Sequence, residues 1–109
     1  MGYDKNLAFR VSTTLEYLPN LVEKKMFGGV GYLLDGNMAC GVLKEYLIVR
    51  VGKARYQEAL NHPHTKVFDT TGQPMTGWVM VSPDGCMEDA DLSKWVQMGV
   101  DFASSLPPK

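Results

Sequence analysis

The chain has 109 residues, of which 45% are apolar and 21% charged, and its formal net charge is −1. This length suits one domain with its own core and is too short for two, so we expect residues 1–109 to form a single domain. The composition is unlike that of disordered chains, and no apolar run reaches the roughly 20 residues of a membrane span. The start, "MGYDKNLAFR", lacks the apolar core of a secretion signal. We therefore expect a folded, cytoplasmic protein.

The charge also bears on the class of partner. Direct nucleic-acid binding depends on a surplus of Lys and Arg, which this chain lacks, so the composition disfavours it. Charge is nevertheless uneven along the chain. Residues 1–55 carry eight basic and five acidic side chains, and residues 56–109 carry three and seven.

An amphipathic helix is the first element expected. Asp4 is a suitable N-cap, and Pro19 is placed to stop the helix. The apolar residues that recur at helical spacing between them are Leu7, Val11, Leu15 and Leu18.

Strand patterns follow. "MFGGVGYLL" and "NMACGVL" flank Asp35-Gly36, a typical pair for the type I′ turn of a hairpin. "EYLIVRV" comes directly after Lys44. Three consecutive antiparallel strands, after a "PNLV" linker, are the simplest interpretation.

The second half of the chain again predicts a helix that is followed by strands. "KARYQEALNH" predicts a short helix that ends before Pro63. Two strands, Lys66 to Asp69 and Gly77 to Val81, are separated by the turn-forming "TTGQP", and a final helix precedes "LPPK". The resulting order, α-β-β-β-α-β-β-α, predicts an α+β two-layer sandwich with an antiparallel sheet.

Two-residue turns at 35–36 and 44–45 fix a register for the three strands, because side chains alternate between the two faces. One face is then wholly apolar and is expected to carry the helices, and it comprises Leu33, Met38, Cys40, Val42, Leu47, Val49 and Val51. Gly29 and Gly31 are expected on the same face, where their small size lets a helix pack closely. The opposite face comprises Val30, Tyr32, Ala39, Leu43, Tyr46, Ile48 and Arg50, with Gly41.

This opposite face is too apolar for a solvated sheet face. Either another part of the chain covers it or the register shifts, or else it binds a partner. Tyr and Arg among small residues suit an interface. If this face binds a partner, the surface for a protein partner or for a homodimer consists of Val30, Tyr32, Leu43, Tyr46, Ile48 and Arg50.

Candidate chemistry is sparse. "GGVG" leads into a hairpin and not into a helix, which argues against a phosphate-binding loop. The pair His62 and His64 is one or two ligands short of a zinc site, and Cys40 is expected to point into the core. We predict no catalytic, cofactor-binding or metal-binding residue. The alternative is a small-ligand-binding domain or minor enzyme between sheet and helices, with polar contacts from Lys24, Lys25, Arg50 or His64.

A family resemblance spans nearly the whole chain. "KKMFGGVGYLLDGNMACGVL", "YLIVRVG" and "FDTTGQPMTGWVMV" before a terminal helix resemble the N-terminal domain of the TfoX/Sxy family of bacterial competence regulators. The most specific matches are Met26-Phe27-Gly28-Gly29, Asp35-Gly36 and Gly77-Trp78.

The resemblance implies a fold of the secretion-chaperone-like type and a non-enzymatic regulatory role in DNA uptake. It also implies a partner of the cyclic-AMP receptor type at competence promoters, and it offers no catalytic residues. Full-length regulators carry a second domain, whereas this chain ends at "LPPK". We therefore expect either a single-domain member or a fragment of a two-domain regulator.

Overall fold

The structure is a computed structural model that describes residues 3–26, 28–69 and 74–108, with only the backbone of Met26 and Pro74. In chain order the elements are α1 (Lys5–Leu15), β1 (Leu21–Met26), β2 (Gly29–Leu34), β3 (Asn37–Leu43), β4 (Tyr46–Arg50), η1 (Lys53–Arg55), α2 (Tyr56–Leu60), β5 (Thr65–Asp69), β6 (Pro74–Val81), η2 (Pro83–Gly85) and α3 (Asp89–Ser104). The predicted α+β class is confirmed, and the predicted helices and strands occur in the predicted order.

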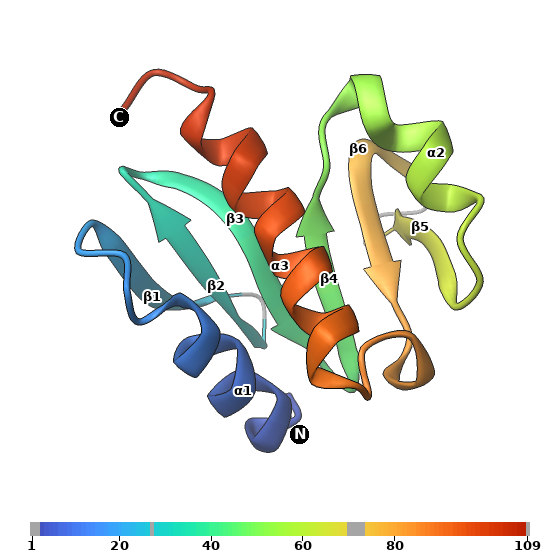
Figure 1. Ribbon diagram of the computed structural model, residues 1–109, viewed down its shortest axis with the longest axis horizontal. Helices are drawn as coiled ribbons and strands as arrows, with labels where there is room; N and C mark the ends of the chain where they lie inside the picture. Colours follow the sequence, from blue (N-terminus) through green and yellow to red (C-terminus); the bar gives the residue numbers. More distant parts are fainter. Residues whose placement is uncertain (1–2, 27, 70–73, 109) are drawn as a thin grey trace.

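All strands join one antiparallel sheet in the order β1-β2-β3-β4-β6-β5. Figure 1 shows α1 and α3 crossing the same face of this sheet. Ala59 of α2 belongs to the same core as these two helices, so α2 lies on that side as well. The fold is thus a helix layer on one side of a sheet.

The first helix forms where its cap and apolar spacing predict. Asp4 has an extended backbone, and its carboxylate accepts a hydrogen bond from the backbone N–H of Leu7 at 3.0 Å. Leu7, Val11 and Leu15 are buried against the sheet. The helix ends at Leu15, one turn before Pro19.

The first strand, β1, was not predicted. It occupies part of the expected "PNLV" linker and the residues after it, and it shares only Met26 with the segment "MFGGVGYLL" that was predicted as the first strand. Its sequence, "LVEKKM", has charged residues at three consecutive positions and therefore no clear apolar alternation. It forms because it pairs along its whole length with β2, from Leu21 opposite Leu34 to Met26 opposite Gly29.

The hairpin turns agree with the sequence. Asp35 and Gly36 both have positive φ, 52° and 86°, as a type I′ turn requires. The next turn also has two residues, since Leu43 pairs with Tyr46. The predicted "TTGQP" turn and Phe27 of the family motif lie outside the described residues, apart from the backbone of Pro74.

Gly77, like Gly28 and Gly36 of the family motifs, has positive φ, at 93°. Its carbonyl oxygen accepts hydrogen bonds from the backbone N–H groups of Val51 and Gly52, at 2.8 and 3.0 Å. These bonds hold the end of β4 against β6, and Trp78 follows directly in β6.

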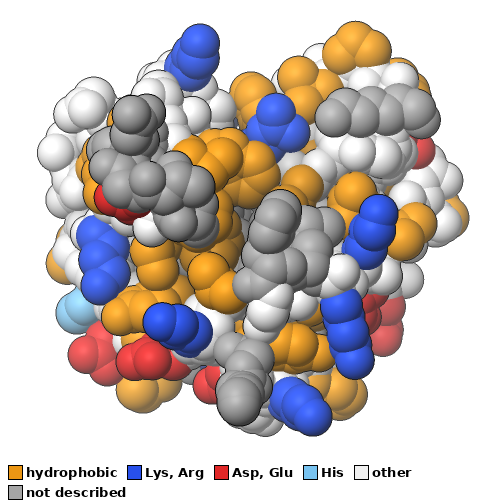
Figure 2. Space-filling model, turned by 180° about the vertical axis from the view of Figure 1, so that it is seen from behind, with side chains coloured by type: hydrophobic (Ala, Val, Ile, Leu, Met, Phe, Trp, Pro, Cys, Tyr) orange, Lys and Arg blue, Asp and Glu red, His pale blue; other side chains and the backbone are white. Residues whose placement is uncertain are grey.

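The core lies between the sheet and the helices. Its fully buried side chains include Leu47, Val49, Val79 and Val81 from the sheet and Val96 from α3. The described helices include none that is both long and apolar enough to cross a membrane. Among the described residues no helix lies on the other face of the sheet, which Figure 2 shows with apolar side chains and surrounding Lys and Arg.

Candidate interaction surface

A β-bulge decides which side chains reach the face of the sheet that has no helix. Leu33 pairs with Met38 as predicted, but Tyr32 pairs with Cys40, so Ala39 is an extra residue in β3. Beyond the bulge, the pairing of β2 is shifted by one residue from the predicted register. The face of every β2 side chain is therefore opposite to the expected one.

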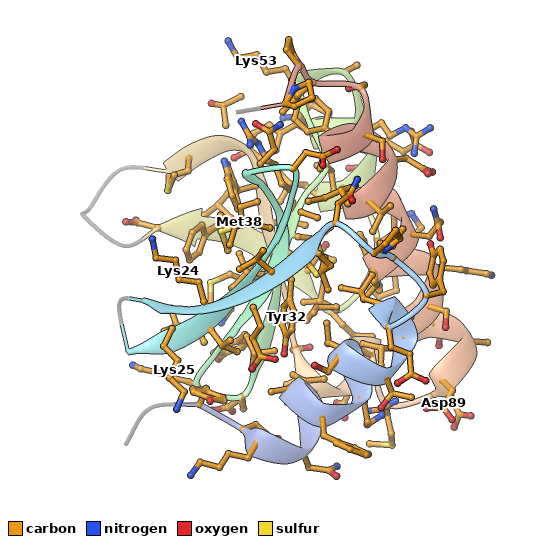
Figure 3. The ribbon with its side chains drawn as sticks, turned by 90° about the vertical axis from the view of Figure 1, so that its left-hand side faces the viewer. Lys24, Lys25, Tyr32, Met38, Lys53 and Asp89 are labelled. Carbon is orange, nitrogen blue, oxygen red and sulfur yellow. The ribbon has the colours of Figure 1, made fainter. Side chains whose placement is uncertain are left out.

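Val30 and Tyr32 are consequently not surface residues, and that part of the predicted partner surface is wrong. Both are buried in the core on the helix side, and Tyr32 is 0% exposed. The Tyr32 hydroxyl donates a hydrogen bond to the carbonyl oxygen of Ala8 in α1 at 2.9 Å. Figure 3 shows this side chain between the strands and α1. Burial, followed by the nearby Glu23 carboxylate, raises the pKa of Tyr32 above its usual value.

Leu33 and Met38 also lie on the face opposite to the predicted one. They were expected under the helices, yet they alternate with the core residues Tyr32 and Leu34 and with Asn37, and so lie on the far side. Both are half-buried. The sequence contains no direct signal for the bulge, because Ala39 and Cys40 are both small and apolar and fit either face.

The predicted register between β3 and β4 is confirmed, from Leu43 opposite Tyr46 to Cys40 opposite Val49. The remaining four residues of the predicted surface therefore do lie on the far side. Leu43, Tyr46 and Arg50 are half-buried, but Ile48 is only 2% exposed. Ile48 is therefore buried within this face and is not accessible to a partner.

We call this side of the sheet the open face. Pairing places on it two side chains of β6, since Met80 is opposite Ile48 and Trp78 opposite Arg50. Two side chains of β5 join them: Lys66, opposite Met80, and Phe68, whose ring lies 6.1 Å from that of Trp78. Sequence reasoning did not assign these four residues to the face, because it could not place β6 beside β4.

Cations on the open face stack on aromatic rings. The Arg50 guanidinium carbon lies 5.3 Å from the centroid of the Trp78 ring and 5.2 Å from that of Phe102 in α3. The Lys66 ammonium lies 4.6 Å from the centroid of the Tyr46 ring and donates a hydrogen bond to its hydroxyl at 3.3 Å. Such contacts hold long cationic side chains flat on the surface.

Most of the charges on the open face are positive. Lys24 of β1, Arg50 and Lys66 lie on it, and Figure 3 shows Lys24 directed away from the helices. Apart from Asp69, where β5 ends, the described strand residues of this face include no carboxylate. In Figure 2, Lys and Arg side chains surround the apolar patches of this face. The surface is therefore apolar and aromatic with a positive potential.

Glycines line the open face between β2 and β3. A Cβ added at Gly41 would lie 2.7 Å from the carbonyl oxygen of Val30, and one at Gly29 would collide with that of Val42. The expectation that Gly29 and Gly31 lie under a helix is wrong, because they alternate with the buried Val30. The small size of Gly29 and Gly41 allows the close approach of the two strands.

The other candidate residues do not form a common site. His62 packs edge-on against Trp95 at 5.3 Å between ring centroids. Lys24 and Lys25 lie on opposite faces of β1. Within the described ranges, no group of three or more His, Cys, Asp or Glu could hold a metal ion.

The Cys40 thiol is buried as predicted, and burial raises its pKa to about 12. It is therefore protonated near neutral pH and is not an activated nucleophile.

A hollow of about 210 Å³ lies between η1 and α3. Its lining includes Met98, Phe102, Arg55 and Asp101. The four residues that were predicted to contact a small ligand, Lys24, Lys25, Arg50 and His64, do not line it. Cavities that bind small organic ligands usually exceed about 300 Å³. The structure therefore favours the open face over this hollow as the candidate site.

Comparison with known proteins gives one family. A family model described as the TfoX N-terminal domain matches residues 13–103, which is most of the chain. A search of curated proteins finds no match.

Proposed function

Because the chain belongs to the TfoX N-terminal domain family, which is associated with competence regulation, we propose that it is a non-enzymatic regulatory domain that binds another protein. The observation that carries this proposal is the open face, where Tyr46, Trp78 and Arg50 are partly exposed among apolar side chains. Tyr, Trp and Arg are the residues that contribute most to binding at protein interfaces.

The two faces of the sheet support the same proposal. The helix side is filled by a packed core, whereas the open face holds half-buried apolar side chains such as Leu33, Met38 and Met80. Apolar side chains that share one exposed surface are typical of binding sites in soluble proteins. The buried, protonated Cys40 thiol argues against nucleophilic catalysis at this residue.

For the partner, the family's association with competence regulation supports a transcription factor of the cyclic-AMP receptor type. A domain of this kind acts by contact with such a factor and needs no nucleic-acid affinity of its own. The formal net charge of −1 agrees with that division of roles.

Site-specific photo-crosslinking in bacterial cells tests the proposal. A photoreactive amino acid in place of Tyr46 on the open face should form an adduct with a protein that mass spectrometry identifies. The matched control replaces Lys94, an exposed residue of α3 on the helix side, and should form none. Adducts at Lys94 alone, or equal adducts at both positions, would contradict the open face as the binding surface.

A further inference from the structure

We infer that the occupant of the open face is an acidic, apolar segment of a partner protein that lies in extended form along β4 and β6. The inference rests on the proposed function and adds the chemistry of the partner. The juxtaposition that carries it is a pair of ring-stacked cations, Lys66 on Tyr46 and Arg50 on Trp78, on either side of Met80.

The positions of Tyr46 and Arg50 in β4 set the pattern of the segment. Tyr46 and Arg50 are four residues apart in β4, which corresponds to about 13 Å at ~3.3 Å per residue. An extended chain spans the same distance in four residues, with every second side chain on one face. Carboxylates at positions i and i+4 would meet Lys66 and Arg50. A large apolar side chain at i+2 would then contact Met80.

The stacked cations are well prepared for carboxylates. The Lys66 side chain is already held on the ring of Tyr46, and the Arg50 side chain contacts the rings of both Trp78 and Phe102, so less rotamer entropy is lost when a partner binds. An Arg guanidinium that lies flat on a ring still has N–H groups available at its edge.

A second copy of the chain does not fit this face. Two copies that pack face to face around a two-fold axis would bring together two surfaces that both carry the cations Lys24, Arg50 and Lys66. Like charges across an interface are strongly unfavourable. The charge pattern therefore favours an acidic partner over self-association.

Single-stranded nucleic acid is disfavoured for a different reason. Binding of this type depends on aromatic rings that are free to stack on bases. Among the described aromatic side chains of this face, Tyr46 and Trp78 each carry a cation on the ring, and Phe68 packs against Trp78. Three cations are also few for a continuous phosphate track.

Selection of displayed random 12-residue peptides on the whole, folded chain tests the inference. Selected peptides should be enriched in the pattern acid-x-apolar-x-acid. A synthetic peptide of the selected sequence should bind at least tenfold more weakly to K66E than to the natural chain. K94E carries the same charge change on the helix side and should bind within twofold of the natural chain. Thermal unfolding of each variant verifies that it is folded.

The other outcomes contradict the inference in distinguishable ways. Peptides that are not acidic, but that lose binding in Y46A, would overturn the acidic segment and leave the proposed function standing. Failure to select any peptide, or selected peptides that bind Y46A and K66E as they bind the natural chain, would also overturn it. Crosslinking at Tyr46 then judges the proposed function separately. Binding of a single-stranded 30-mer oligonucleotide that K66E abolishes would assign the face to nucleic acid instead.

Discussion

Cys40 is the residue at which burial has the clearest consequence for solution behaviour. Its side chain is 0% exposed, and its pKa rises to about 12 because an ionised thiolate would lose its hydration in the core. The thiol of an unfolded chain titrates near a pKa of about 8.5. Above that pH the unfolded state loses a proton that the folded state keeps. The stabilising contribution is therefore complete below pH ~8.5 and is lost as the pH rises toward 12.

We expect the Cys40→Ala variant to show weaker alkaline destabilisation than the natural chain. Between pH 8 and pH 10, the Cys40 thiol should lower the free energy of unfolding by about 2 kcal/mol, a change that alanine cannot produce. Urea denaturation at both pH values measures it. The raised pKa values of Tyr32 and Cys86 act in both proteins and cancel in the comparison. An equal pH dependence in the two proteins would contradict the burial of this thiol.

Asn37 is the only polar side chain among the described buried residues, at 2% exposed. Its side-chain amide donates a hydrogen bond to the carbonyl oxygen of Pro107 at 2.9 Å. The contact joins the start of β3 to the segment after α3, which lies 70 residues away in the chain. The sequence alone does not indicate it, since Asn after Asp-Gly also fits an ordinary exposed hairpin.

The Asn37→Asp variant tests this contact. A carboxylate cannot donate to the Pro107 carbonyl, and its burial without a donor is unfavourable, so we expect a loss of about 2–4 kcal/mol at pH 7. Burial should raise the pKa of the new carboxyl group, so the variant should regain part of this loss as the pH falls and the group becomes protonated. Urea denaturation at pH 7 and pH 5 measures both effects. A variant as stable as the natural chain at pH 7 would show that Asn37 is accessible to water.

At the scale of elements, α3 approaches the sheet closely at Gly99. A Cβ added there would collide with the carbonyl oxygen of Ala39, the extra residue of the bulge. The backbone of the bulge in β3 therefore lies directly against Gly99 of α3. The sequence marked glycines as sites of close packing, but it assigned helix packing to Gly29 and Gly31 and not to Gly99.

The Gly99→Ala variant has two opposing effects on the free energy of unfolding. Alanine is favoured over glycine inside a helix by about 1 kcal/mol, but here its methyl group meets backbone atoms that cannot rotate away. We expect the steric effect to dominate and to lower the free energy of unfolding by about 1–3 kcal/mol. Ser93→Ala, at an exposed position of α3, should change it by less than about 0.5 kcal/mol. A more stable G99A variant would place α3 farther from the sheet.

The sequence predicted correctly the features that depend on neighbouring residues, and it did not reveal those that depend on residues far apart in the chain. Local signals predicted local structure: the Asp4 cap, the Asp35-Gly36 turn and the pairing of β3 with β4 are all confirmed. The face of Tyr32 was wrong because one inserted residue reverses all later positions, and small apolar side chains on both strands do not reveal it. The charged edge strand β1 and the neighbour of β4 were missed because strand order is a long-range property.

The whole molecule provides a final test through its state of association. The sequence left a homodimer through the second face open, and the structure places Lys24, Arg50 and Lys66 on that face. A two-fold pairing would therefore be repulsive at low salt. We expect light scattering at ~100 μM chain and ~50 mM salt to give the mass of one chain. Tyr46→Glu should leave this mass unchanged, because Tyr46 then makes no contact with a second copy of the chain.

The salt dependence gives this expectation a second, independent readout. If repulsion between open faces keeps the chains apart, an increase to ~1 M salt shortens the screening length to about 3 Å and weakens that repulsion. Any association that appears at high salt should then be lost in Tyr46→Glu and retained in Lys94→Glu, since Lys94 lies on the helix side. A dimer already present at low salt, and broken by Tyr46→Glu, would show that a second copy occupies the open face and would contradict the acidic partner.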